Sequence, residues 1–397
     1  MDAFKYIIIG GGMTADSASR GIRQLDPAGS IAVFSNEPYP PYSRPPLSKG
    51  LWKGKPVDRI WRNTEARYGV NLFLNTPISA IHPAEKTVRS VEGKSFYYEK
   101  LLIATGGSPR RLPCHDPGVI YLNTYEAYLK LREKTEQGDH FIVIGAGFTG
   151  MEISAALAGM GKKVTIIFPS PLIGRRIFPA DLAQAITDNF IEKGITLLNS
   201  TRVSDIQSKK DKYLVITADG RHLHATGVIA GIGSAPNIAL AGSAGLAVDD
   251  KGIVVDECLR TSDPDIYAAG DVASFFNSFL GHRLRAEHED NSNVQGRTAG
   301  HNMAGQIEPY TYLPFFYSDI FDSGYEAIGD IDADLDTVSD WITPYRQGTV
   351  YYLRNNKICG VLLWNLRRRL DEARKLIERQ ETVSRDELKG LITPTVF

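Results

Sequence analysis

Two glycine-rich segments of this chain have the residue types and the spacing that can hold a phosphate group. Residues 10–15 (GGGMTA) follow the apolar run 6–9, and residues 145–150 (GAGFTG) follow the apolar run 141–144. In a G-x-G-x-x-G/A turn the glycines let the backbone approach a pyrophosphate, whose charge meets unpaired N–H groups at the start of the next helix. One match alone could be only a tight turn. Two matches, each between an apolar strand and a helix pattern, predict that one polypeptide holds two dinucleotides.

A protein that holds two dinucleotides side by side most simply passes a hydride from a nicotinamide to a flavin. The three cysteines, Cys114, Cys258 and Cys359, form no C-x-x-C pair, which argues against a redox-active dithiol and against a disulfide framework. Small buried apolar side chains are the simpler interpretation of them. Electrons that reach a flavin would therefore leave for an outside acceptor.

The sequence around the two loops predicts the elements that position them. Residues 5–34 have the pattern of a strand, a glycine turn, a helix over 15–25 and a second strand over 30–34, and residues 140–168 repeat this order. Two βαβ units predict parallel sheets in an α/β fold. Short buried strands are also expected over 100–109, 227–233 and 261–271, and the last ends in Gly270-Asp271, which places a carboxylate at the carboxyl edge of a sheet.

From residue 311 the pattern changes to alternating, aromatic-rich strands, such as 350–353 and 358–364, and a closing helix over 366–378. This region looks antiparallel and lacks a phosphate loop, so we expect an α+β domain that shapes the acceptor side. The proline-rich stretch 38–47 is expected to be an ordered loop over a site.

Composition narrows the class of protein further. A formal net charge of −1, with 43% hydrophobic and 23% charged residues, indicates no bulk attraction to nucleic acid or membranes, and 397 residues favour two or three domains. No apolar stretch reaches the roughly 18 residues that a membrane span needs, and a strand pattern follows Met1 at once. We therefore expect a cytoplasmic protein.

Further motifs resemble the FAD-dependent pyridine-nucleotide oxidoreductases, in particular the ferredoxin reductases of oxygenase systems and the apoptosis-inducing-factor group. They span nearly the whole chain: residues 44–49 (RPPLSK), 104–110 (ATGGSPR), 269–271 (AGD) and 324–329 (GYEAIG). The Glu287-His288 pair, residues 363–365 (LWN) and Ala373-Arg374 are more similar to the apoptosis-inducing-factor branch.

The resemblance implies a glutathione-reductase-like organisation with two Rossmann-like domains and an α+β C-terminal domain. An FAD-binding domain would comprise residues 1–112 and 238–306, an NAD(P)H-binding domain 113–237, and the C-terminal domain 307–397. The implied cofactors are FAD together with NADPH or NADH.

The resemblance also assigns site residues. Lys49 and Glu152 match a charged pair beside the flavin: the ammonium would stabilise the negative charge of the reduced ring, and the carboxylate would fix the ammonium and orient the nicotinamide amide. His288 joins them as a catalytic candidate, because it could shield the ring or donate a hydrogen bond as charge develops. The other cofactor-binding residues would be Gly10, Gly12, Ala15, Glu37 or its neighbour Asn36, Arg44, Ala104, Thr105, Gly106, Arg110, Gly145, Gly147, Gly150, Ser170, Arg175, Arg176, Gly233, Gly270, Asp271, Glu287 and Tyr317.

Two departures from the family pattern bear on specificity. The strand over 163–168 is followed by Pro169-Ser170 without a carboxylate, and Arg175-Arg176 come shortly after. A missing anion with guanidinium groups nearby favours the 2′-phosphate of NADPH, although solvated loop arginines are an equal alternative, so the choice between NADPH and NADH stays open. Tyr317 stands where relatives often carry tryptophan. The tyrosine keeps a ring face that can stack and adds a hydroxyl group.

The leading hypothesis is an FAD-dependent NAD(P)H oxidoreductase that passes electrons to a ferredoxin-type iron-sulfur protein. The alternatives are an apoptosis-inducing-factor-like flavoprotein with slow turnover and redox-controlled conformation or dimerisation, and a quinone or oxygen reductase. The basic run 367–369 could dock an acidic ferredoxin. Pairing of these arginines with Asp371 and Glu372 on one helix explains the charges without a partner. A homodimer stays open.

Overall fold

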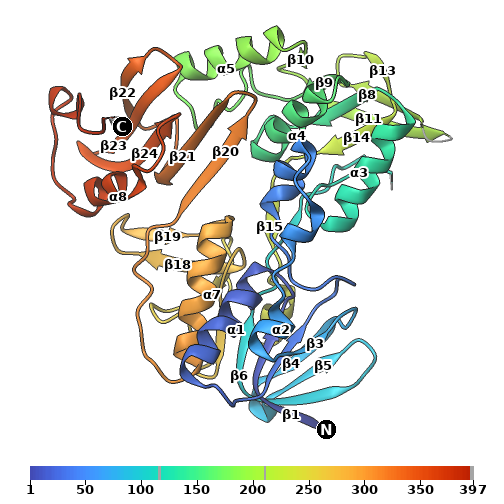
Figure 1. The fold of residues 1–397 in the computed structure, drawn as a ribbon, viewed down its shortest axis with the longest axis vertical. Helices are drawn as coiled ribbons and strands as arrows, with labels where there is room; N and C mark the ends of the chain where they lie inside the picture. Colours follow the sequence, from blue (N-terminus) through green and yellow to red (C-terminus); the bar gives the residue numbers. More distant parts are fainter. Residues whose placement is uncertain (115–117, 210–211, 394–397) are drawn as a thin grey trace. The chain divides into compact units, whose positions relative to one another are not determined.

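The computed structural model describes residues 1–114, 118–209 and 212–393, and the chain divides into two compact units (Figure 1). Unit 1 comprises Met1–Arg44, Val57–Ser108 and Ala235–Pro314; unit 2 comprises Pro45–Pro56, Pro109–Ser234 and Phe315–Phe397. The chain leaves unit 1 through β7 (Gly107–Pro109) and returns through β15 (Ser234–Pro236). Each unit is thus assembled from segments that lie far apart in the sequence.

Unit 1 is built on a seven-stranded sheet with strand order β3-β2-β1-β6-β5-β4, in which β17 also pairs with β6. Its elements are β1 (Asp2–Ile9), α1 (Met13–Leu25), β2 (Ile31–Phe34), η3 (Val57–Ile60), α2 (Thr64–Tyr68), β3 (Asn71–Phe73), β4 (Ile78–His82), η4 (Pro83–Glu85), β5 (Thr87–Ser90), β6 (Ser95–Ile103), α6 (Ala239–Ser243), β16 (Ile253–Val254), β17 (Ile266–Ala268), β18 (Ala273–Asn277), β19 (His282–Leu284) and α7 (Glu289–Met303).

The first loop follows the buried end of strand β1 in unit 1. Strand β1 is parallel to both β2 and β6, and its last four residues are buried because helices cover the sheet. Helices α1 and α7 lie side by side on the sheet (Figure 1). A Cβ at Gly296 of α7 would lie 2.5 Å from the carbonyl oxygen of Thr14 in α1, so only glycine permits this close approach. The packing holds the first turn of α1 fixed beside the loop.

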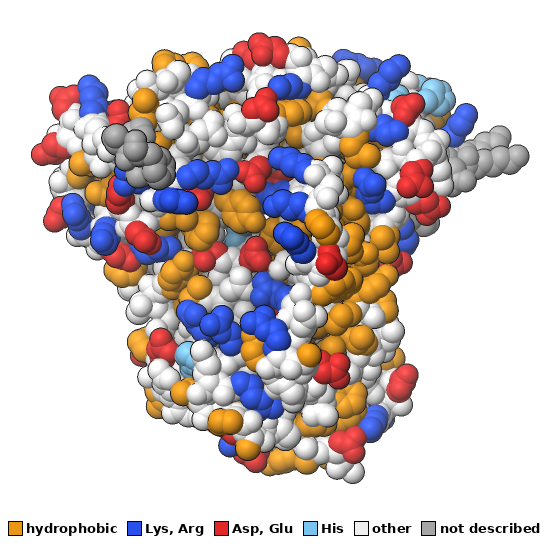
Figure 2. Space-filling view, viewed as in Figure 1, with side chains coloured by type: hydrophobic (Ala, Val, Ile, Leu, Met, Phe, Trp, Pro, Cys, Tyr) orange, Lys and Arg blue, Asp and Glu red, His pale blue; other side chains and the backbone are white. Residues whose placement is uncertain are grey.

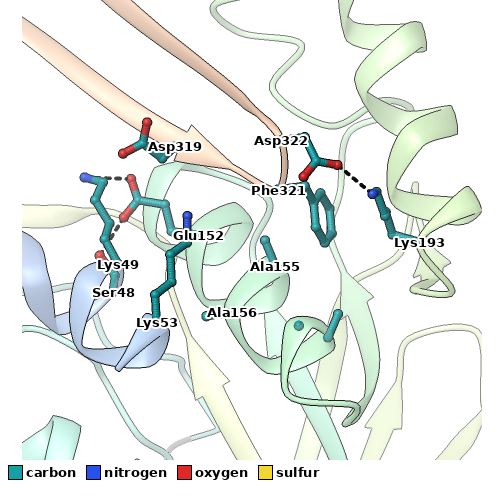
Figure 3. A pocket seen from close by; sticks show the side chains of 12 residues that line it. Ser48, Lys49, Lys53, Glu152, Ala155, Ala156, Lys193, Asp319, Phe321 and Asp322 are labelled. Atoms are coloured by element: carbon teal, nitrogen blue, oxygen red, sulfur yellow. Dashed lines mark hydrogen bonds and ion pairs between the residues drawn. The ribbon is translucent and has the colours of Figure 1, made fainter. Parts of the chain in front are cut away.

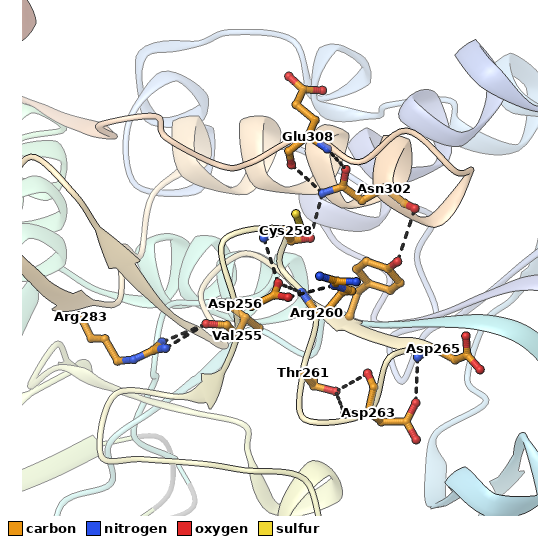
Figure 4. A network of polar contacts seen from close by, with 11 residues as sticks. Val255, Asp256, Cys258, Arg260, Thr261, Asp263, Asp265, Arg283, Asn302 and Glu308 are labelled. Carbon is orange, nitrogen blue, oxygen red and sulfur yellow. Dashed lines mark hydrogen bonds and ion pairs between the residues drawn. The ribbon is translucent and has the colours of Figure 1, made fainter.

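The segment that leads into β17 is fixed by a polar network (Figure 4). The Asp256 carboxylate accepts hydrogen bonds from the backbone N–H groups of Cys258 and Arg260 and from Arg260 Nε, each at 2.9 Å. The amide of Asn302, on α7, donates to the Cys258 carbonyl at 2.8 Å. These contacts hold β17 in the sheet, where it leads directly to Asp271.

Unit 2 contains a parallel four-stranded sheet of order β10-β9-β8-β14 and a three-stranded antiparallel sheet of order β11-β12-β13. The elements of this part are η1 (Pro45–Leu47), η2 (Gly50–Lys53), α3 (Tyr125–Gln137), β8 (His140–Ile144), α4 (Phe148–Gly159), β9 (Lys163–Ile167), α5 (Ala180–Glu192), β10 (Thr196–Leu198), β11 (Val203–Lys209), β12 (Lys212–Thr217), β13 (His222–Ala225) and β14 (Gly227–Ala230). Strands β8 and β9 are parallel and α4 connects them, so the second loop begins α4 as predicted.

The C-terminal part of unit 2 is an antiparallel five-stranded sheet of order β20-β21-β24-β23-β22, packed against α8. Its elements are β20 (Phe315–Ile320), β21 (Ser323–Gly329), β22 (Asp336–Thr343), β23 (Gln347–Arg354), β24 (Lys357–Trp364), α8 (Leu370–Glu378) and η5 (Asp386–Leu388). The antiparallel prediction is confirmed. The helix expected from residue 366 begins only at Leu370, because Asn365 and Arg368 adopt left-handed backbone angles (φ 52° and 62°) that interrupt a right-handed helix.

The predicted fold class is confirmed, with two parallel-sheet α/β parts and an antiparallel C-terminal part. The three-domain boundaries stay a prediction. No helix among the described residues is long and apolar enough to cross a membrane.

Candidate active site

The first glycine loop, in unit 1, has the shape of a phosphate cradle. Gly10 has φ +122°, and a Cβ there would lie 2.1 Å from the carbonyl oxygen of Ala104, so the turn requires glycine. Gly12 begins α1 in an extended conformation without a side-chain cap, and a Cβ at Gly12 would meet nothing within 4 Å. Open space therefore faces the uncapped N–H groups of α1, which fits a dinucleotide phosphate. Ala15 is fully buried and packs beneath the loop.

The end of β2 brings a carboxylate and a guanidinium together. Glu37 accepts hydrogen bonds from Tyr42 Oη and from Arg44 Nη2, both at 2.7 Å. The adjacent Asn36 is exposed. Glu37 is thus held in one place, whereas Asn36 is turned to solvent, and the assignment of the ribose contact to either residue stays a prediction.

Asp271 lies at the carboxyl end of β17, beside the start of α7. Its carboxylate accepts a hydrogen bond from Ser292 Oγ at 3.1 Å, and the Gly270 N–H donates to Gln295 at 2.8 Å. Burial raises the pKa of Asp271 to about 6, and the charge of Glu287 adds to the rise, while Ser292, Arg44 and Arg285 oppose it. A carboxyl at this point can exist in either protonation state near neutral pH, which suits a contact to a ligand hydroxyl or phosphate.

The remaining unit 1 candidates surround the same sheet edge. Thr105 Oγ1 donates to the Asn237 carbonyl at 3.0 Å, and the Gly106 carbonyl accepts from the Asn237 N–H at 3.0 Å, which fixes the turn after β6. Glu287 is exposed and ion-paired to Arg285. His288 is the N-cap residue of α7, and its side chain forms no capping hydrogen bond.

The second glycine loop, in unit 2, repeats the geometry of the first. Gly145 has φ +100°, and a Cβ there would lie 2.3 Å from the carbonyl oxygen of Gly231. Gly147 begins α4 without a side-chain cap and has nothing within 4 Å of a built Cβ. A Cβ at Gly150 would lie 2.0 Å from the Gly145 carbonyl, so this glycine permits the helix to pack against its own loop. The arrangement fits a second dinucleotide phosphate.

Lys49 and Glu152 meet as a largely buried ion pair. Lys49 Nζ lies 3.0 Å from Glu152 Oε1, and the two side chains are 15% and 6% exposed. Ser318 Oγ donates to the same carboxylate at 2.6 Å and Ser48 Oγ at 2.5 Å, so hydroxyl donors bind both of its oxygens. The Lys49 ammonium also lies over the ring of Tyr317, 4.4 Å from its centroid. Charges buried to this extent are stabilised here because the two groups pair with each other and two hydroxyl groups donate hydrogen bonds to the carboxylate.

Glu152 lies on α4, in the turn that follows the second glycine loop. The helix therefore connects the dinucleotide cradle to the charged pair within unit 2. Lys49 precedes η2 and Tyr317 lies in β20, so three segments distant in the sequence converge at one carboxylate. Sequence reasoning named Lys49, Glu152 and Tyr317 but missed the roles of Ser48 and Ser318. The available signal was their position, directly before Lys49 and directly after Tyr317.

The other unit 2 candidates make their hydrogen bonds elsewhere in the unit. Arg110 is exposed and its Nε donates to the Ser234 carbonyl at 3.1 Å, while its N–H donates to the Gly233 carbonyl at 2.9 Å. Ser170 Oγ donates to the Leu172 carbonyl at 2.9 Å, beyond the end of β9. Arg175 is half-buried and Arg176 exposed in the following loop.

Parallel sheets, each with a glycine cradle at a helix start, define a class of proteins that bind two dinucleotides. Residues 4–298 match the family described as pyridine nucleotide-disulphide oxidoreductase, and residues 299–344 and 342–379 match the apoptosis-inducing factor, mitochondrion-associated, C-terminal family. The chain therefore belongs to the pyridine nucleotide-disulphide oxidoreductase family. It is an FAD-dependent NAD(P)H oxidoreductase, and the expected cofactors, FAD and NAD(P)H, are confirmed.

Individual relatives are similar to nearly the whole chain. It is 34% identical to apoptosis-inducing factor 1, mitochondrial, of Dictyostelium discoideum, over 96% of this chain and 80% of that protein. It is 32% identical to the 5,5′-dehydrodivanillate O-demethylase ferredoxin reductase subunit of Sphingobium sp., over 99% and 98%. The covalent putidaredoxin reductase-putidaredoxin complex has a TM-score of 0.90 at 27% identity, over 98% and 95% of the two chains.

Proposed function

We propose that this enzyme takes a hydride from NAD(P)H and delivers electrons singly to a small iron-sulfur protein. The observation that carries the proposal is the largely buried ion pair between Lys49 and Glu152, in which Glu152 lies on the helix that begins at the second glycine loop. When bound, the cofactors would supply the redox chemistry, since a nicotinamide can donate a hydride and a flavin can release the two electrons one at a time together with a proton.

The residues around Glu152 would hold the charges that this transfer requires. The hydrogen bonds from Ser48 and Ser318 fix the Glu152 carboxylate, and Glu152 in turn fixes the Lys49 ammonium. A fixed ammonium stabilises negative charge that develops on a reduced ring, without the reorganisation that water would need. The position of Tyr317 against Lys49 supports a role at the flavin edge.

Several observations support an external one-electron acceptor. The three cysteines are free and lie in different parts of the fold, so the described residues offer no dithiol to receive electrons. The Sphingobium relative is named a ferredoxin reductase subunit, and a relative from Ectopseudomonas oleovorans is named rubredoxin-NAD(+) reductase. Acidic and basic side chains are interspersed over the face in Figure 2, so docking would depend on a local patch rather than on net charge.

The test is steady-state reduction of a panel of acceptors by the FAD-loaded protein, with NADH and NADPH in turn. We expect fast reduction of a ferredoxin or rubredoxin, measured through cytochrome c, and a rate that falls as salt rises. Fast turnover with quinone or oxygen, and slow turnover with every iron-sulfur protein, would refute the proposed acceptor. Replacing Arg175 and Arg176 by alanine should raise KM for NADPH and not for NADH if these arginines bind the 2′-phosphate.

A second candidate is a slow flavoprotein whose reduced, nucleotide-bound form changes conformation or dimerises. The match of residues 299–379 to the apoptosis-inducing-factor C-terminal family favours it. A long-lived charge-transfer absorbance after anaerobic reduction, together with dimerisation measured by light scattering, would support this candidate. Rapid reoxidation by an iron-sulfur protein without dimerisation would exclude it.

A further inference from the structure

The short segment that carries Lys49 is held by unit 2. Residues 45–56 belong to this unit, although the chain on either side of them belongs to unit 1. Within the segment, Ser48 and Lys49 lie between the 3₁₀ turns η1 and η2 and reach Glu152 on α4 (Figure 3). Two short 3₁₀ turns make few internal hydrogen bonds, so contacts from elsewhere in unit 2 must fix the lysine ammonium.

Trp52 is the residue of η2 that anchors these turns. Its side chain is buried, and its indole N–H donates to the Leu47 carbonyl of η1 at 2.7 Å. One side chain thus ties the two turns together across Lys49. The indole also packs edge-to-face on Tyr128 of α3, with 5.3 Å between the ring centroids. The position of Lys49 therefore depends on where α3 holds the indole.

Arg132 follows Tyr128 by one turn of α3, on the same face of the helix. Its guanidinium carbon lies 5.2 Å from the centroid of the Trp52 ring, and indole attracts a cation over its face more strongly than other aromatic side chains do. Arg132 Nη1 also donates a weak hydrogen bond to the sulfur of Met160 at 3.9 Å, at the C-terminal end of α4. One half-buried guanidinium therefore contacts both the turn that follows Lys49 and the helix that carries Glu152.

The charged pair borders a cavity of about 340 Å³ (Figure 3). Ser48, Lys49 and Glu152 line this cavity. Trp52 and Arg132 do not line it. The guanidinium thus stays outside the space beside the pair, and its contact with the indole is the route by which it can act on Lys49.

We propose that Arg132 is a positioning residue for the reaction: by holding Trp52 on α3, it keeps the Lys49 ammonium against the Glu152 carboxylate. The inference rests on the proposed role of Lys49 in hydride transfer and adds a residue that acts through another side chain. An ammonium that is already held where negative charge develops needs no rearrangement during the reaction. If η2 loosens, the ammonium spends part of its time away from the carboxylate, and the rate falls in proportion.

The first measurement is the rate of flavin reduction by saturating NAD(P)H in stopped-flow, with the FAD-loaded protein. Arg132→Met keeps an apolar side chain beside the indole and removes the cation, so the rate should fall about fivefold while the half-saturating nucleotide concentration stays within about twofold. Arg132→Lys keeps a cation and should retain at least about half of the wild-type rate. Lys130→Met makes the matched change at an exposed residue of α3 and should leave the rate unchanged.

A double-mutant cycle separates positioning from general destabilisation. Lys49→Met alone should reduce the rate about 100-fold. Adding Arg132→Met to that variant should change the rate by less than about 1.5-fold, because Arg132 acts through Lys49. Two independent effects would instead multiply to about 500-fold.

Chemical labelling of the Lys49 amine measures the same positioning without turnover. Lys49 is 15% exposed and paired, so acetic anhydride should modify it slowly in the wild type. The modification, followed by peptide mass spectrometry, should be about fivefold faster in Arg132→Met, because the amine leaves its partner more often. Lys94, which is 57% exposed, is the internal reference and should react equally in both proteins.

Two results would overturn the proposal: unchanged labelling of Lys49 in Arg132→Met, or effects of Arg132→Met and Lys49→Met on the reduction rate that multiply. A wild-type reduction rate in Lys49→Met, together with faster labelling in Arg132→Met, would refute the catalytic role of Lys49 and still support Arg132 as the residue that holds it. Failure of the proposed function and failure of this inference are therefore distinguishable.

Discussion

Replacing Lys49 by methionine should destabilise unit 2 by leaving a buried carboxylate without its cation. At 3.0 Å the pair is worth about 5 kcal/mol of Coulomb energy at an effective dielectric of about 20, and desolvation of both groups offsets part of this. Ser48 and Ser318 still donate to Glu152 after the change. We therefore expect a loss of about 3 kcal/mol, at the lower end of the range for breaking a buried pair.

Replacing Glu152 distinguishes the contribution of the ion pair from that of side-chain packing. Glu152→Gln keeps the shape of the side chain and leaves Lys49, which is 15% exposed and can reach water, so it should cost less, about 1–2 kcal/mol. The double variant Lys49→Met/Glu152→Gln should cost clearly less than the sum of the two, with a coupling energy of about 2 kcal/mol.

Denaturant unfolding followed by tryptophan fluorescence can measure the coupling energy between Lys49 and Glu152 in unit 2 alone. Trp52, Trp341 and Trp364 belong to unit 2 and Trp61 to unit 1, so a Trp61→Phe background makes the signal specific to unit 2. The same variants should reduce the rate of flavin reduction by NAD(P)H in stopped-flow, about 100-fold for Lys49→Met. A coupling energy below about 0.5 kcal/mol, with wild-type reduction rates, would refute the reasoning that this pair is a buried catalytic unit.

Three further predictions concern the cradles and their support. In the flavin-free protein, the pKa of Asp271 is about 6 in the folded state and about 4 in the unfolded state. The free energy of unfolding should therefore fall by about 2–3 kcal/mol as pH rises through this window. Denaturant titrations at several pH values should show this slope in the wild type and not in Asp271→Asn. Gly10→Ala would place a Cβ 2.1 Å from the Ala104 carbonyl and should cost about 3 kcal/mol, whereas Gly12→Ala meets no neighbouring atom and should lower FAD affinity while leaving the thermal midpoint of the flavin-free protein near the wild-type value. Thr124→Ala removes the side-chain cap of α3 and should cost about 1 kcal/mol in unfolding experiments; an unchanged midpoint would show that this cap is dispensable.

Local sequence patterns were sufficient for both dinucleotide cradles. Each depends on a strand, a glycine turn and a helix that are contiguous in the chain. The turn can therefore be recognised from the residues that form it. Gly10 and Gly145 both adopt the positive φ that only glycine accepts readily, at the positions the motif predicts. The boundary of α8 was less accurate. Asn365 is a residue type that favours left-handed backbone angles, but nothing in the side chain of Arg368 indicates that it adopts them too.

The charged pair was named by resemblance and not by pattern. Lys49 and Glu152 are 103 positions apart, and no periodicity connects a 3₁₀ segment to the middle of a helix. Of the two serines that donate hydrogen bonds to the carboxylate, Ser48 adjoins Lys49 in the sequence, whereas Ser318 comes from a third segment, β20. The contact between Ser318 and Glu152 depends on how β20 packs beside α4. That arrangement is set by interactions between residues far apart in the sequence.

By itself the sequence determined the two cradles, the parallel and antiparallel sheets and the class of oxidoreductase, because glycine conformation and hydrophobic periodicity are properties of short segments. The tertiary structure alone decided that Glu152 is buried, paired with Lys49, and bound by the hydroxyl groups of Ser48 and Ser318. The physical reason is that burial and charge balance depend on neighbours contributed by distant parts of the chain, and these neighbours exist only once the core has packed.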